Sequence, residues 1–159
     1  MIIYGIDVGL TGAIAVLVNG ALVTVDDMPV VEHSGGVVRR RIDSAGLAAL
    51  LRRYRTQHGV DAELAVIEQV AAMPRQGSSS TFSLGHSLGA VHAVVQTLGI
   101  PSAMVAPATW KRAAGLGRDK ALSRAKASEI FPAQAGMWAR AKDHNRAEAV
   151  LLAAYGAKQ

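Results

Sequence analysis

The stretch "YGIDVGLTGAIAVLVNG", residues 4–20, decides how this chain folds. Residues 2–8 and 12–18 are mostly apolar and predict two short strands, and the "GLTG" segment between them predicts a tight turn. The pair Asn19-Gly20, flanked by alternating apolar residues, is a strong signal for a two-residue hairpin turn into a third strand over 21–26. The chain is therefore expected to open with an antiparallel meander of three strands.

A single carboxylate, Asp7, ends the first apolar run. Burying a charge costs free energy unless a cation or a set of hydrogen-bond donors replaces the lost water. Three explanations are open at this point: a Lys or Arg partner, a phosphate-binding turn over 9–12 with Asp7 at its edge, or a metal ion.

The remaining sequence alternates between helical and strand patterns. We predict helices over 43–58, 81–98, 119–130 and 143–156, a short helix around Trp110, strands over 62–68 and 102–106, and a loop over 28–42. Gly156 is expected just beyond the last helix, at the position called C′. Three meander strands followed by strands alternating with helices predict an α/β fold: a mixed five-stranded sheet flanked by helices, in one domain spanning 1–159.

Composition narrows the class of protein. The chain has 159 residues, half of them hydrophobic, which suits one globular core. It has no cysteine, which excludes disulfides and thiolate metal sites and makes a cytoplasmic setting the expectation. The first residues lack the features of a signal peptide, and no apolar run approaches the roughly 18 residues that span a bilayer, so no membrane partner is expected.

Charge is distributed unevenly along the chain. Residues 1–68 carry six basic and eight acidic side chains, a net charge of −2, whereas residues 69–159 carry eleven basic and four acidic ones, a net charge of +7. Basic clusters of this kind suit a polyanion, although each could also be an ordinary solvated surface. The clusters comprise Arg39, Arg40 and Arg41, then Arg52, Arg53 and Arg55, then Lys111, Arg112, Arg118, Lys120, Arg124 and Lys126.

Acidic residues are expected to converge. Asp7 and Glu68 each end an apolar strand, and the last helix adds Asp143 at its start and Glu148 further along, with His144 on the same face as Glu148. Clustered carboxylates repel one another unless a divalent cation lies among them, and oxygen ligands indicate Mg²⁺, with Mn²⁺ as a substitute. Two such ions roughly 3.5–4 Å apart would support phosphodiester hydrolysis. A simpler alternative stays open for each carboxylate. Asp7 could cap the turn over 9–12, and Glu68 could pair with an arginine. Asp143 could be only the N-cap of the last helix, and Glu148 an exposed helix residue.

Four segments together resemble the RuvC Holliday-junction resolvases of the RNase H-like nuclease superfamily, especially the divergent versions carried by phages. "GIDVGLTG" is similar to their opening strand, "VIEQV" to a strand end, and "RAEAVLLAAYG" to the terminal helix. "APATWKRAAGLGRDKALSRAKASEIFP" resembles the segment where these enzymes carry DNA-contacting lysines. The similarity extends from residue 1 to about 156.

This resemblance implies an RNase H-like fold, a homodimer acting on branched DNA in recombination and repair, and two Mg²⁺ ions per active site. It implies metal ligands at Asp7, Glu68 and Glu148, a fourth group from the turn before the last helix, and a catalytic role for Lys120. The expected DNA-binding residues are Arg75, Gln76, Ser79, Lys111, Arg112, Arg118 and Lys120.

The sequence departs from the family pattern at several positions. Val8 stands where a proline is usual, and Asn145 stands where the family has an aspartate, so we expect Asp143 to complete the metal site, with His144 as the next choice. The loop "AAMPRQGSSS" lacks the aromatic wedge of the bacterial housekeeping enzymes. Met73 and Arg75 would replace it with weaker stacking, which predicts relaxed sequence preference or other branched substrates.

The sequence thus predicts a magnesium-dependent endonuclease that cuts branched DNA by attack of water, leaving a 3′-hydroxyl and a 5′-phosphate. Two alternatives remain: a related nuclease that processes structured RNA, and a junction-binding protein with weak or no catalysis. A small-residue stripe of Gly85, Gly89 and Ala93 would suit dimerisation, unless it faces the sheet. A sugar-kinase-like phosphotransferase begins in a similar way but needs at least twice this length.

Overall fold

The fold is built on a mixed sheet of five strands. The computed structural model describes residues 1–32, 40–59, 62–71, 77–117 and 120–159, apart from the side chains of 120 and 121. The strand order is β3-β2-β1-β6-β7, with β1 antiparallel to β2 and parallel to β6. The strands are β1 (Ile2–Asp7), β2 (Ala13–Val18), β3 (Ala21–Asp27), β6 (Glu63–Glu68) and β7 (Ser102–Val105). The predicted meander and mixed sheet are confirmed.

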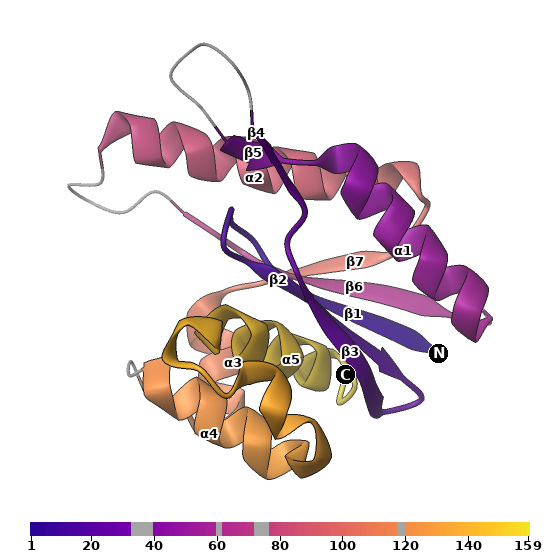
Figure 1. Ribbon diagram of the computed structural model, residues 1–159, viewed down its shortest axis with the longest axis vertical. Helices are drawn as coiled ribbons and strands as arrows, with labels where there is room; N and C mark the ends of the chain where they lie inside the picture. The colour runs from indigo at the N-terminus through magenta and orange to yellow at the C-terminus, as the bar shows by residue number, and fades with distance from the viewer. Residues whose placement is uncertain (33–39, 60–61, 72–76, 118–119) are drawn as a thin grey trace.

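Helices cover both faces of this sheet (Figure 1). One layer contains α1 (Ser44–His58) and α2 (Ser78–Thr97), and the other contains α3 (Pro107–Ala113), α4 (Lys120–Ile130) and α5 (His144–Gly156). Two 3-10 segments, η1 (Pro132–Trp138) and η2 (Ala141–Asp143), connect α4 to α5. In the described part of the chain, no helix is both long and apolar enough to cross a membrane.

The hairpin between β2 and β3 forms as predicted. Asn19 and Gly20 both adopt the left-handed region, with φ of 49° and 83°, and Val18 pairs with Ala21. Positive φ at both central residues is the geometry of the type I′ turn, whose twist matches that of the flanking strands.

Three local predictions were wrong. The loop predicted over 28–42 contains a small antiparallel sheet of β4 (Val30–Glu32) and β5 (Arg40–Ile42), because pairing between distant ends overrides the loop-like composition. Helix α2 begins at Ser78 rather than Thr81, since a serine run is compatible with a first helical turn. Gly156 is the last residue of α5, not a C′ residue, and its lack of a side chain lets α5 pack closely, because a Cβ there would lie 2.4 Å from Val66 Cγ2.

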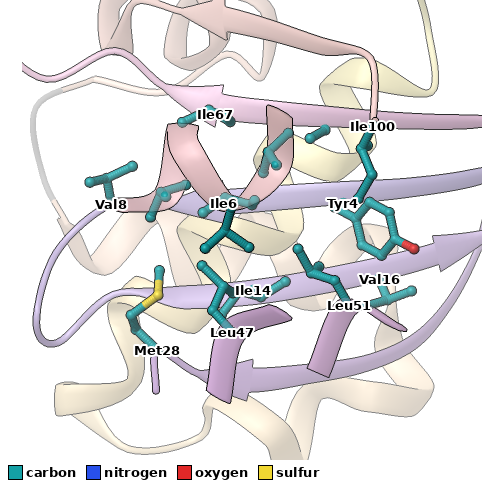
Figure 2. Close-up of a cluster of buried hydrophobic side chains, with 14 of the residues drawn as sticks. Tyr4, Ile6, Val8, Ile14, Val16, Met28, Leu47, Leu51, Ile67 and Ile100 are labelled. Carbon is teal, nitrogen blue, oxygen red and sulfur yellow. The ribbon is translucent and has the colours of Figure 1, made fainter. Parts of the chain in front are cut away.

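Alternation along the central strands sorts side chains between two cores. Tyr4 and Ile6 of β1 face α1 and α2, where they join the apolar cluster shown in Figure 2. Ile3 faces the opposite way, toward α5. By the same period of two, Asp7 projects toward the α5 side, one residue after the last apolar pair of β1 and β6.

Gly5 allows α5 to approach the sheet. A Cβ at this position would lie 2.1 Å from the carbonyl oxygen of Ala149 and 2.4 Å from the backbone nitrogen of Ala153. Only glycine therefore permits the backbone of α5 to lie against β1. This close approach brings the amino-terminal part of α5 to the end of the strand that carries Asp7.

Candidate active site

Two acidic side chains lie at adjacent strand ends. Strands β1 and β6 run parallel with Ile6 opposite Ile67, so Asp7 and Glu68 are neighbours at the carboxyl end of the sheet. Their exposed fractions are only 7% and 9%. Crevices at the carboxyl ends of parallel strands are where α/β sheets commonly bind ligands.

The helical layer supplies a third carboxylate and a cation. Glu148 of α5 is 6% exposed, which excludes the reading of an exposed helix residue. Its charge raises the pKa of both Asp7 and Glu68, which identifies the three carboxylates as one electrostatic group. The ammonium of Lys111, on α3, lies 3.0 Å from Glu148 Oε1. We call Asp7, Glu68 and Glu148 the acidic trio.

Neutral donors hold two members of the trio. The indole N–H of Trp110 donates to Glu68 Oε1 at 3.1 Å, and the Ser123 hydroxyl of α4 donates to Glu148 Oε1 at 3.2 Å. An arginine partner for Glu68, the simpler reading of the sequence, is therefore replaced by an indole. Each donor fixes one oxygen of its carboxylate.

In the described part of the chain, the trio has less positive charge around it than its three carboxylates would need. Burial is the largest cause that raises the pKa of Asp7 well above its ordinary value, followed by the charges of Glu68 and Glu148, while Lys111 opposes the shift. Burial likewise raises the pKa of Glu68, against the hydrogen bond from Trp110. Both shifts show that the ionised forms are disfavoured without a further cation.

Asp143 has a different environment. Its carboxylate accepts hydrogen bonds from Arg140 Nε and Nη2, both at 2.9 Å, and these bonds lower its pKa to about 2. It occupies the N-cap position of α5, yet its side chain makes no capping bond to the helix. The carboxylate that we expected to complete the metal site is thus paired with Arg140, and its role as a metal ligand stays a prediction.

The neighbouring residues of this turn also have local partners. His144 Nδ1 lies 3.4 Å from the carbonyl oxygen of Ala141. Asn145 donates through Nδ2 to the backbone oxygen of Thr11 at 2.6 Å and to its hydroxyl at 3.0 Å. Asn145 thereby ties α5 to the turn that follows Asp7.

The expected DNA-binding residues are placed unevenly. Lys111 is bound to Glu148, whereas Arg112 and Ser79 are exposed. Arg75, Gln76 and Arg118 lie outside the described residues, as does Met73, and Lys120 begins α4 without a described side chain.

The sequence did not predict three residues that contact the carboxylates of this region. Trp110 precedes Lys111 in the chain, but nothing in the sequence indicates that its indole meets Glu68. Ser123 gives no signal at all. Arg140 does give one, because its spacing of three residues from Asp143 is that of a local ion pair.

The donor set of the trio fits a hard divalent cation. It offers carboxylate oxygens, it is buried, and burial and mutual repulsion raise the pKa values of Asp7 and Glu68. Among the residues that the structure describes, no three His, Asp or Glu side chains already form a coordination cage. Lys111 and Ser123 both contact Oε1 of Glu148.

The mixed sheet, with helices on both faces and acidic groups at the carboxyl ends of β1 and β6, defines an α/β domain with the RNase H-like fold. Solved structures of RuvC from Thermus thermophilus share this fold. The complex with Holliday junction substrate has a TM-score of 0.64 at 17% identity, covering 99% of this chain and 95% of that chain. A second RuvC structure from Thermus thermophilus has a TM-score of 0.57 at 19% identity, covering 99% and 96%. No protein-family model and no curated protein matches the chain. The predicted fold resemblance to RuvC is confirmed.

Proposed function

We propose that this protein is a metal-dependent endonuclease that cuts branched DNA, with the four-way junction as its first candidate substrate. The observation that carries the proposal is the acidic trio, assembled from three distant segments and, among the described residues, facing the single ammonium of Lys111. The likeness in fold to a RuvC structure that contains Holliday junction substrate supports the choice of DNA.

Asp7, Glu68 and Glu148 would hold Mg²⁺ or Mn²⁺. When bound, a pair of such ions lowers the pKa of water and stabilises the attacking and leaving oxygens of a phosphodiester. The trio orients the water for in-line attack on phosphorus. The new P–O bond forms as the bond to the 3′ oxygen breaks, and a proton ends on that oxygen, giving a 3′-hydroxyl and a 5′-phosphate.

Lys111 connects the metal site to DNA in this proposal. Its side chain is about one quarter exposed and its ammonium lies on Glu148. From there the ammonium would hold a phosphate oxygen near the scissile bond or stabilise developing negative charge. Exposed Arg112 and Ser79 would contact the backbone further away, and from the sequence we propose the same for Arg118, Arg75 and Gln76. We propose a catalytic role near the scissile phosphate for Lys120, as the resemblance to the resolvases implies.

We further propose that the enzyme is a homodimer. Gly85, Gly89 and Ala93 of α2 are exposed, and a Cβ at either glycine would meet nothing within 4 Å. The alternative that this stripe faces the sheet is therefore wrong. Figure 1 shows the amino-terminal half of α2 extending beyond the strands, where Phe82 is 63% exposed. A second copy could approach this helix closely.

The direct test is cleavage of a four-way DNA junction in Mg²⁺ or Mn²⁺. Asp7→Asn is expected to lower cleavage roughly 10³-fold or more, since several kcal/mol of transition-state stabilisation are lost, and to leave junction binding intact. Glu129→Gln is the matched control, because it makes the same change of charge on an exposed side chain. Persistent cleavage by Asp7→Asn would reject the assignment. Faster cleavage of a folded RNA than of the junction would favour the RNA-processing alternative.

A junction-binding protein without catalysis is the second candidate. The Lys111–Glu148 and Arg140–Asp143 ion pairs favour it, because both use carboxylates that a two-metal site would need. Tight junction binding without turnover in either metal would support this candidate.

A further inference from the structure

Trp110 contacts both an anion and a cation of the candidate site. Its side chain is fully buried, with 0% exposed, and its N–H donates to Glu68 Oε1 at 3.1 Å. The ammonium of Lys111 lies 5.1 Å from the centre of its ring. The edge of one indole thus meets a carboxylate, and its face meets the lysine that neutralises Glu148.

We infer that Trp110 is a positioning residue that fixes the orientation of the Glu68 carboxylate for metal binding. The inference rests on the proposed function and deepens it, because it assigns a role at the same site to a residue that is not itself a ligand. The hydrogen bond occupies Oε1 of Glu68 and restricts rotation of the carboxylate, and it does not use Oε2.

The hydrogen-bond acceptor of Trp110 indicates a positioning role. A buried indole N–H needs an acceptor, but a neutral one is sufficient. The second tryptophan of the chain shows this, since Trp138 is 1% exposed and donates to the hydroxyl of Ser128 at 2.9 Å. Trp110 instead donates to the buried carboxylate of Glu68, and such a hydrogen bond becomes stronger once the carboxylate is ionised, as a metal ligand must be.

Residues that donate a hydrogen bond to a metal ligand, without binding the metal themselves, influence the metal affinity of the site. A carboxylate ligand that rotates freely loses part of its binding energy to ordering, and removal of such a hydrogen bond typically weakens metal binding 10–100-fold. Ser123 makes the equivalent bond to Glu148, so each of these two glutamates has one oxygen held by a neutral donor. Asp7 needs no such donor, because its short side chain is attached to β1, the central strand of the sheet.

The first experiment examines the metal-free protein by NMR. Two tryptophans give two indole N–H signals, which Trp110→Phe and Trp138→Phe assign. Glu68→Gln removes the charge of the acceptor and is expected to shift the Trp110 signal while leaving the Trp138 signal in place. An unchanged Trp110 signal would overturn the inference. The intact tryptophan is observed here, so the result does not depend on the folding of Trp110→Phe.

The second experiment measures Mn²⁺ affinity from the EPR signal of free Mn²⁺, without DNA. We expect Trp110→Phe to bind Mn²⁺ ~10-fold or more weakly than wild type, and Trp138→Phe to bind it equally well. Both variants lose a buried indole N–H, so their urea midpoints show whether stability alone explains a difference. Excess Mn²⁺ should restore junction cleavage by Trp110→Phe.

The outcomes separate the inference from the function on which it rests. Equal Mn²⁺ affinity of Trp110→Phe and wild type would overturn the inference and leave the nuclease proposal in place. Failure of the wild-type protein to bind Mn²⁺ would overturn both.

Discussion

Two groups of carboxylates lie near the start of α5, and their electrostatic environments are opposite. The acidic trio of Asp7, Glu68 and Glu148 shares one lysine, and the pKa values of Asp7 and Glu68 are raised by burial and mutual repulsion. The paired carboxylates, Asp143 and Asp27, each bind an arginine through two hydrogen bonds, and their pKa values are lowered.

The difference separates a binding site from a structural element. The paired carboxylates are neutralised by Arg140 and Arg146 and have no need of a further cation. The negative charges of the trio are only partly compensated by the described residues, and a divalent ion can neutralise them. The trio is also assembled from distant segments, whereas the Arg140–Asp143 pair is local. The Arg146–Asp27 pair, in contrast, joins α5 to β3. The two groups should therefore respond differently to backbone changes, metal and pH.

The largest expected effect comes from Gly5→Ala. The new Cβ would overlap the α5 backbone at Ala149 and Ala153, so α5 must move away from β1. We expect a loss of about 3 kcal/mol or more in the free energy of unfolding, measured with urea, together with weaker metal binding. The ion pair between Arg140 and Asp143 is local and should survive this change.

Gly136→Ala is the matched control for Gly5→Ala, because a Cβ at Gly136 meets nothing within 4 Å. It should change the urea midpoint little. If the two variants were equally stable, close packing of α5 on β1 would not be what assembles the trio.

Divalent metal should distinguish the two groups directly. Mn²⁺ at about 100 times its Kd should stabilise the wild-type protein by about 2.7 kcal/mol, measured as a shift of the urea midpoint, and EDTA should reverse the shift. Glu68→Gln should abolish most of this stabilisation. Asp143→Asn should retain it, because Arg140 already neutralises Asp143. An equal loss in both variants would instead place Asp143 among the metal ligands, as the sequence analysis expected.

The sequence predicts strand ends better than side-chain partners. The meander, the strand that ends on Glu68 and the last helix follow from apolar periodicity and turn residues, which are local signals. The convergence of Asp7 and Glu68 follows from the parallel pairing of β1 and β6. The contacts of Trp110 and Ser123 depend on how α3 and α4 pack. The ion pair of Asp143 with Arg140 results from a competition between possible partners of Asp143. Residue identity alone does not decide such a competition.

Low pH should reduce the contribution of the Arg140–Asp143 ion pair to the stability of the folded protein. The pKa of Asp143 in the folded protein is about 2, below its ordinary value of 3.8, because of the hydrogen bonds from Arg140. A depressed pKa stabilises the folded state above the unfolded pKa, and this contribution is lost as pH falls from about 4 to about 2. In urea titrations over this range, Asp143→Asn should lose less stability than wild type. If the two proteins lost stability in parallel, the pair would make no pH-dependent contribution.

The smallest expected effect lies between the two groups, at Asn145. Its amide ties the first turn of α5 to Thr11, two residues before β2 begins, so it connects the strand of Asp7 to the helix of Glu148. Because these hydrogen bonds are exposed, Asn145→Ala should cost about 1 kcal/mol or less. Asn145→Asp replaces the donor with an acceptor and adds an acidic group at the position where the resemblance to the resolvases implies an aspartate. If that carboxylate reaches the acidic trio, Mn²⁺ should bind Asn145→Asp more tightly than wild type even though the metal-free variant is less stable. A variant that loses stability without a gain in Mn²⁺ affinity would show that position 145 anchors the Thr11 turn and lies outside the reach of the metal.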